Sequence, residues 1–177
     1  MKRASSAEQP VPGDALLHPV AIAAIAVLVL NDHFLKSAAP GLITGKLSDF
    51  AGLTFFPLFL LGAWEVAVSV VGRWGGPTRR SLILAVLATG SVFAVVKATA
   101  LGSEALSVGL GWGQWLAAWP LATVAGLELT HPAPVLVVQD TTDLVALLAL
   151  TIALAIGVPR CARASTPDPR GSFATVT

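Results

Sequence analysis

The sequence predicts an all-α protein: a polytopic membrane helical bundle of four transmembrane helices, with an interfacial or re-entrant helix in the third loop. Of its 177 residues, 55% are hydrophobic and only 12% are charged. Its mean hydropathy is +0.78, which leaves too little polar surface to cover a water-facing domain of this size. Four apolar runs also approach the length of about 20 helical residues that crosses a bilayer. The chain is therefore expected to be an integral membrane protein.

The N-terminal part combines a polar segment with the first apolar run. Residues 1–14 are polar and interrupted by Pro and Gly, so we expect a polar N-terminal tail. The first transmembrane helix is predicted over 15–31, and because its apolar run is short, we expect it to extend into its polar flank. We do not expect residues 1–39 to be cleaved as a signal peptide, because charged residues precede the Ser-Ala-Ala site at 37–39.

Three further apolar runs follow. We predict transmembrane helices over 49–71, 81–101 and 140–158. The segment Pro-Gly-Leu-Ile-Thr-Gly, residues 40–45, is predicted to form the turn between the first two helices. Glycine and alanine inside the spans would let neighbouring helices approach closely. The last polar segment, 159–177, is expected to be a flexible cytoplasmic tail.

The third loop of the predicted membrane domain, 15–158, contains a tryptophan-rich segment. Trp112, Trp115 and Trp119 are spaced i, i+3 and i+7, so they share one face of a helix. We predict an interfacial or re-entrant helix over about 112–129, with the tryptophans as anchors at the membrane–water boundary. A fifth transmembrane helix is the alternative, but it would move the arginines after the last helix to the outer side.

Lysine and arginine are distributed unevenly between the two sides of the predicted bundle. With the N-terminus in the cytoplasm, the outer loops hold only Lys36 and Lys46. The cytoplasmic side then holds Lys2, Arg3, Arg73, Arg79, Arg80, Arg160, Arg163 and Arg170. Because cytoplasmic loops carry the excess of these residues in membrane proteins, we predict that both termini are cytoplasmic.

Ionisable residues gather at the predicted outer ends of all four helices. The first helix closes with a pair of them, and the second opens with another pair. The third carries a lysine near its outer end, and the fourth opens with two aspartates. Because separate segments deliver these groups to one level of the membrane, we interpret them as a ligand-binding site. The candidate residues are Asp32, His33, Lys36, Lys46, Asp49, Lys97, Asp140 and Asp143.

Helix capping is the alternative role for the acidic members of this set. Asp140 is placed to cap the last helix, and Asp143 to complement its dipole. Ser48 or Asp49 has the corresponding position at the second helix. In that case the carboxylates satisfy free backbone N–H groups and bind no ligand.

Two charged side chains inside the predicted helices need partners. A charge costs about 2.5–3.5 kcal/mol at the centre of a membrane helix, and less near its edge. Lys97 either extends outward to water or pairs with an outer carboxylate. The candidate partners are Asp49, Asp140 and Asp143. Glu65 lies in the cytoplasmic half of the second helix, where it is either protonated or paired with an inner-loop arginine such as Arg73.

Other classes of site lack their sequence signals. The net charge of +1 provides no basic surface for nucleic acid. Cys161 is the only cysteine, so an intramolecular disulfide is excluded. His33 and His131 stand near carboxylates, but their spacing matches no known metal motif, and no nucleotide-binding or hydrolase motif occurs. We therefore predict no metal and no cofactor.

Two short motifs resemble those of a known family. Lys-Leu-Ser-Asp-Phe (46–50) opens the second predicted helix, and Asp-Thr-Thr-Asp (140–143) opens the last. This layout resembles the VanZ-like small bacterial membrane proteins, which carry a basic-x-x-His-Phe-type motif and an Asp-x-x-Asp motif at these places. Asp49 stands where that family usually has His, and Lys97 where it tends to carry Glu or Gln. The resemblance implies a bacterial cytoplasmic (inner) membrane location and an association with tolerance of glycopeptides that act at the cell surface.

The leading functional hypothesis is a small integral membrane protein whose outer-face polar pocket binds the polar or anionic head group of a membrane lipid or a cell-envelope precursor. One alternative is a structural or partner-binding subunit, working as an oligomer or with another protein, in which the same residues form an interhelical salt-bridge network. An outer-leaflet enzyme with His33 or Asp49 as general base is less expected, because no nucleophile arrangement occurs.

Overall fold

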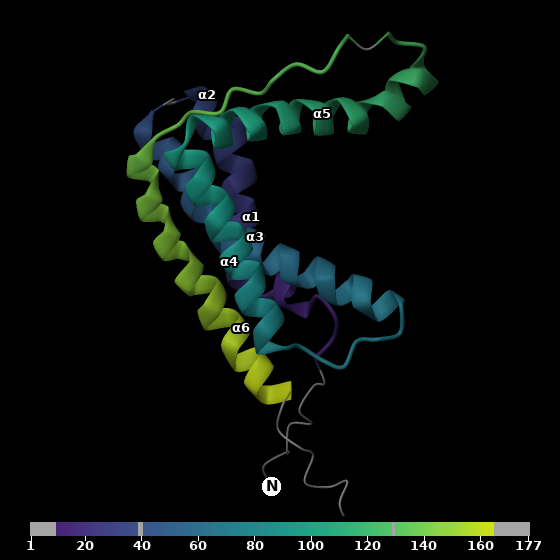
Figure 1. Ribbon diagram of the computed structural model, residues 1–177, viewed down its shortest axis with the longest axis vertical. Helices are drawn as coiled ribbons and strands as arrows, with labels where there is room; N and C mark the ends of the chain where they lie inside the picture. Colours follow the sequence, from purple (N-terminus) through teal and green to yellow (C-terminus); the bar gives the residue numbers. More distant parts are fainter. Residues whose placement is uncertain (1–9, 39–40, 129, 165–177) are drawn as a thin grey trace, which may run out of the picture. The chain divides into compact units, whose positions relative to one another are not determined.

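The structure, a computed structural model, describes residues 10–38, 41–128 and 130–164, and over these residues it is all-α, as predicted. Figure 1 shows the course of the chain. The elements in order are η1 (Asp14–Leu17), α1 (Pro19–Leu30), the π-helical turn η2 (Asn31–Leu35), α2 (Lys36–Ala38), α3 (Leu42–Val70), α4 (Arg79–Ala98), α5 (Ala100–Ala125), the 3-10 helix η3 (Thr141–Ala149) and α6 (Leu150–Ala164).

Within the described chain, three helices are long and apolar enough to cross a membrane: Ile43–Val70, Arg79–Ala98 and Thr141–Ala164. They correspond to the second, third and fourth predicted spans and suggest a multi-pass membrane protein. The predicted first span, 15–31, becomes a shorter apolar helix, Pro19–Leu35. At about 1.5 Å per residue this helix falls short of the roughly 30 Å apolar core of a bilayer, so length alone does not establish the fourth crossing.

The second helix begins earlier than predicted. α3 starts at Leu42, so most of the expected turn at 40–45 is helical instead. The hydroxyl of Thr44 accepts a hydrogen bond from Gly41 N–H and donates one to the Gly41 carbonyl, which organises the first turn. Ser48 and Asp49 consequently lie inside the helix, and the expectation that either caps its N-terminus is wrong.

The chain divides into two compact units, and each is described by itself: residues up to Thr89 together with those from Ala146 onward, and residues Gly90–Val145. In the first unit, α1 and α6 both pack against α3. The core includes the fully buried side chains of Leu58, Leu61 and Leu82, together with small alanines. The small alanines at these contacts let the helix backbones approach closely, and the leucines fill the space between them.

Gly157 allows α6 to pack directly against Leu82 of α4. A Cβ atom at position 157 would lie 2.5 Å from Leu82 Cδ1 and 2.6 Å from its Cδ2. Because Leu82 is itself fully buried, it has no free space into which to move. The contact between these two helices therefore depends on a residue without a side chain.

The second unit contains the last turns of α4, the whole of α5 and an extended segment that returns beside it. Thr99 separates the two helices with extended backbone, and its hydroxyl caps α5 by accepting from Gly102 N–H. The return segment is held to α5 by a hydrogen bond from Val135 N–H to the Ser107 carbonyl. Figure 1 shows this segment as the green trace that follows α5.

The tryptophan-rich segment is helical, as predicted, but with different bounds. α5 covers Ala100–Ala125 and ends at Gly126 in the left-handed conformation, whereas the sequence indicated a helix over about 112–129. Pro120 lies inside this helix. α5 is not among the helices that meet the requirements for a span, and its location at a membrane surface stays a prediction.

Replacing Gly157 with Val should lower the free energy of unfolding by about 1–3 kcal/mol, the usual cost of overpacking a filled core. Thermal denaturation of the purified protein in detergent would measure the change. Gly109→Val is the matched control, because a Cβ atom at Gly109 meets nothing within 4 Å. Equal stability of the two variants would contradict the close packing of α6 against Leu82.

Candidate functional site

The most connected polar cluster in the first unit is centred on Arg160 of α6. Its Nη1 and Nη2 donate to the two carboxylate oxygens of Glu65 in α3, at 2.6 and 2.8 Å. Its Nε donates to Asp14 Oδ1 in η1, and Nη2 also donates to the Val11 carbonyl at 3.1 Å. Glu65 is only 2% exposed and Arg160 only 6%. One buried guanidinium therefore joins three separate segments of the chain.

The backbone around Gly13 brings the N-terminal segment to this cluster. Gly13 has φ +79°, a left-handed conformation that glycine adopts without strain. A Cβ atom at Gly62 would lie 3.4 Å from Gly13 Cα, so the two backbones pack without intervening side chains. Because the backbones are so close, Gly13 N–H can donate a hydrogen bond to Glu65 Oε2, at 2.9 Å. Val11 N–H likewise donates to Asp14 Oδ2.

The geometry of the cluster suits arginine in particular. A planar guanidinium bonds both oxygens of one carboxylate in parallel and still presents its Nε–H to another acceptor. All three of its nitrogens are used here, and both oxygens of Glu65 accept hydrogen bonds. This satisfaction is what makes burial of the charges tolerable, because an isolated ion in an apolar interior is far more costly.

The sequence alone did not predict this pairing. Glu65 was expected to be protonated or to pair with an inner-loop arginine such as Arg73, but it binds Arg160 of α6 instead. Arg160 had been assigned to the flexible tail 159–177, whereas α6 continues to Ala164; residues 165–177 lie outside the described residues. Asp14, assigned to the N-terminal tail, begins η1. The sequence feature that could have indicated this pair was a carboxylate, Glu65, inside one apolar run and an arginine, Arg160, directly after another.

In the second unit, Lys97 pairs with Asp143. Lys97 Nζ lies 2.7 Å from Asp143 Oδ2, and the two side chains are 14% and 11% exposed. The ammonium also lies 5.6 Å from the centre of the Phe93 ring, within the range of a cation–π contact. Of the two alternatives for Lys97, the structure shows pairing, and among the three candidate carboxylates the partner is Asp143.

Asp140 takes the capping role that the sequence offered as its alternative. Its Oδ1 accepts from Thr142 N–H at 2.8 Å, and its carbonyl accepts from Asp143 N–H. These bonds organise the first turn of η3. They also orient Asp143, the residue that binds Lys97.

A third polar cluster lies where α1 meets α3. Asn31 is 1% exposed, and its amide donates to the Thr44 carbonyl and to Ser48 Oγ, each at 2.6 Å. Ser48 Oγ in turn donates to Asp32 Oδ1 at 2.8 Å. Among the described residues, Asn31 Oδ1 is buried without a hydrogen-bond partner. Of these residues, only Asp32 belongs to the predicted site; Asn31 was missed.

The remaining predicted site residues lie on η2, α2 and α3. His33 is exposed, and its Nδ1 lies 3.0 Å from the Val29 carbonyl in the preceding turn. Lys46 and Asp49 lie half-buried on α3, and Lys36 begins α2. The predicted joining of all these residues with Lys97, Asp140 and Asp143 in one outer pocket stays a prediction, because it spans the two units.

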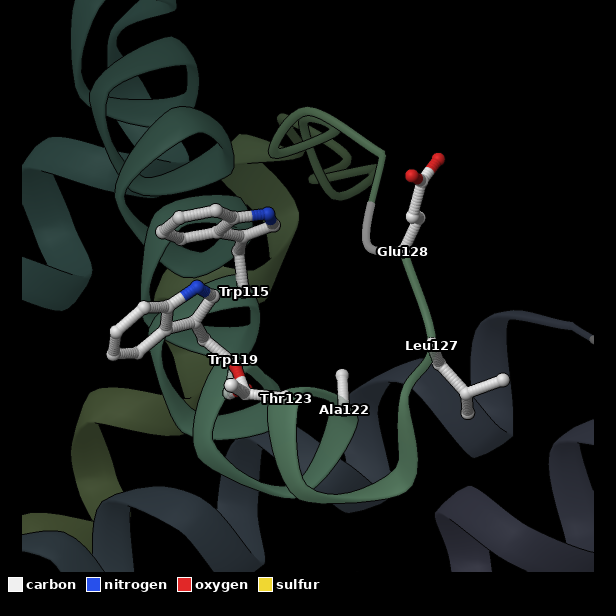
Figure 2. A pocket seen from close by; sticks show the side chains of 6 residues that line it. All are labelled: Trp115, Trp119, Ala122, Thr123, Leu127 and Glu128. Atoms are coloured by element: carbon white, nitrogen blue, oxygen red, sulfur yellow. The ribbon is translucent and has the colours of Figure 1, made fainter.

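Two pockets have linings that differ from the predicted site. One, of about 330 Å³, lies in the second unit; Figure 2 shows Trp115 and Trp119 on one side of it and Glu128 on the other. The second, of about 230 Å³, lies beside Arg160 in the first unit. In the part of the chain that the structure describes, no group of three or more His, Cys, Asp or Glu residues could hold a metal ion.

Arg160→Met should lower the free energy of unfolding by about 3–5 kcal/mol, because it leaves the buried Glu65 and the part-buried Asp14 without their cation. Adding Glu65→Met should restore much of that loss, and chemical denaturation in detergent would measure both. Arg80→Met, at an exposed arginine of α4, is the control and should have little effect. Equal stability of the two single variants would mean that the cluster does not hold the helices together.

The chain thus forms a small helical protein with buried interhelical ion pairs and helices long enough to span a membrane. Comparisons with protein families, with curated proteins and with solved structures give no significant match, so the functional argument depends on the residues themselves.

Proposed function

We propose that this chain is a structural or partner-binding membrane subunit whose buried polar residues hold its helices in register. The observation that carries the proposal is the completeness of the pairing. Arg160 uses all three guanidinium nitrogens on Glu65, Asp14 and the backbone. Groups engaged in this way stabilise helix packing and have little capacity left to bind or transform a ligand.

A membrane makes such pairing more consequential. Apolar helix faces gain little from each other in lipid, since the acyl chains are equally apolar. An ionised group facing lipid is costly, so a charged residue favours the one arrangement in which it meets its counterion. The pairs Glu65–Arg160 and Lys97–Asp143 therefore select which helix faces meet.

We place the protein in a bacterial inner membrane, with both termini in the cytoplasm.

A second candidate function is the binding of a lipid or cell-envelope head group at the outer face. The observation that favours it is Asn31 Oδ1, a buried acceptor that has no partner among the described residues. The neighbouring carboxylate of Asp32 is also an acceptor. This pair suits a head group that donates hydrogen bonds, such as one with an ammonium or hydroxyl group. Of the three lysines in the predicted site, Lys97 is engaged by Asp143.

Variants at Lys97 test the structural function. If the ion pair is structural, Lys97→Met should lower the free energy of unfolding by about 1–3 kcal/mol, because Asp143 is left buried without its partner. The double variant Lys97→Met/Asp143→Leu should recover stability, as measured by denaturation in detergent. If Lys97→Met instead keeps full stability, the ion pair does not hold the helices together and the structural function is contradicted.

Reporter fusions test the proposed topology. A fluorescent protein that folds in the cytoplasm and a phosphatase that is active only outside it would be attached in turn to each end of the chain. We expect fluorescence and no phosphatase activity at both ends, because four crossings return the chain to its starting side. Ends on opposite sides would mean that the helix Pro19–Leu35 does not cross.

A further inference from the structure

A pocket of about 230 Å³ lies in the first unit, where η1 leads into α1 and α6 approaches its end. It lies at the opposite end of α1 from Asn31, so it is separate from the predicted outer site. Its lining combines basic, acidic and apolar side chains: Asp14, Ala15, Leu17, His18, Ile156, Arg160 and Arg163.

Two of the polar residues are already committed. Arg160 and Asp14 bind each other, and the remaining donors of Arg160 are used by Glu65 and the Val11 carbonyl. Asp14 Oδ2 accepts from Val11 N–H. This part of the wall is therefore polar and rigid, with its charges directed at one another.

The two remaining polar groups are both hydrogen-bond donors. The guanidinium of Arg163 is exposed and makes no hydrogen bond or ion pair with the described residues. His18 caps α1 by accepting from Val20 N–H at Nδ1, so in the neutral ring the proton is on Nε2. The pocket thus offers one permanent cation and one N–H donor, a combination that suits a phosphate group.

The rest of the lining is apolar, with Ala15 buried, Ile156 half-buried against the core and Leu17 exposed. Leu17 is 74% exposed, and Ile156 adds a second aliphatic side chain. Arg163 belongs to the last turn of the apolar helix Thr141–Ala164, and His18 precedes the first turn of α1. Basic residues at such helix ends lie at the level of lipid phosphates in a bilayer.

We propose that this pocket binds a phosphate group, held by Arg163 and His18, and that the phosphate belongs to a membrane phospholipid whose apolar part lies against Leu17 and Ile156. The site is independent of the proposed structural function: it uses the donors that remain once the Arg160 cluster has formed. Its loss would leave the cluster intact.

The test uses the full chain in nanodiscs of phosphatidylcholine containing a small fraction of phosphatidylglycerol. The protein is released from the nanodiscs, and the phospholipid that stays bound to it is measured by native mass spectrometry. Folding is measured by thermal denaturation. Arg163→Gln should weaken retention of phosphatidylglycerol about tenfold or more, because a charge-assisted contact to the phosphate is lost. Arg80→Gln is the matched control: it removes the same charge from an exposed arginine that does not line the pocket.

His18→Asn is the second variant. Asparagine keeps a side-chain acceptor for the cap of α1, but its shorter side chain does not carry an N–H as far as the ring Nε2, so it should weaken lipid retention without lowering the denaturation temperature. If Arg163→Gln and Arg80→Gln lose phosphatidylglycerol retention equally, the effect comes from surface charge in general, and the proposal is overturned. Unchanged retention in Arg163→Gln would overturn it as well.

Inorganic phosphate distinguishes the two sources of the anion. In detergent, increasing concentrations of phosphate should displace short-chain phosphatidylglycerol only at large excess, because the free ion gains nothing from Leu17 and Ile156. If inorganic phosphate competes at concentrations equal to those of the lipid, the lipid source is overturned and the pocket is a site for the free ion.

Discussion

The burial of the Arg160 guanidinium is the constraint on which the first unit depends. An ion of this size has a desolvation cost of several kcal/mol in a protein interior, so its counterions must be held in a fixed geometry. Glu65 provides that geometry from α3, and Asp14 provides it from the segment before α1. Gly13 and Gly62 permit the approach, since each lacks the side chain that would separate the two backbones. The helices around this cluster are therefore held by ion pairs as well as by apolar contact.

The same principle accounts for the polar groups elsewhere in the described chain. Lys97 and Asp143 form a mutually satisfied pair, and Asn31 donates to both α3 acceptors within its reach. Polar residues whose hydrogen-bonding groups are all used within the chain stabilise the fold. Polar residues with an unused donor or acceptor are the ones available to bind a ligand. By that criterion Arg163 and His18 belong to the second class, although neither stood out in the sequence as a site residue.

Much of the fold followed from the sequence because apolar run length reports directly on membrane helices. The three long spans were predicted in this way, and so was helical structure around Trp112 and Trp119. Boundaries were less accurate, since the sequence pattern does not show that Thr44 would organise a helix start within a Gly/Pro-containing segment. Pairing partners were the least predictable. Glu65 had to find an arginine distant in sequence, and local spacing carries no information about such a contact.

The position of Arg160 in the chain has a consequence for biosynthesis. It lies 146 positions after Asp14 and 95 after Glu65, so a ribosome completes both carboxylates long before it makes their counterion. If α3 inserts into a membrane as it is made, its carboxyl group enters the lipid before its counterion exists. A chain that ended before the last helix would keep Glu65 without the cation that it has in the finished fold.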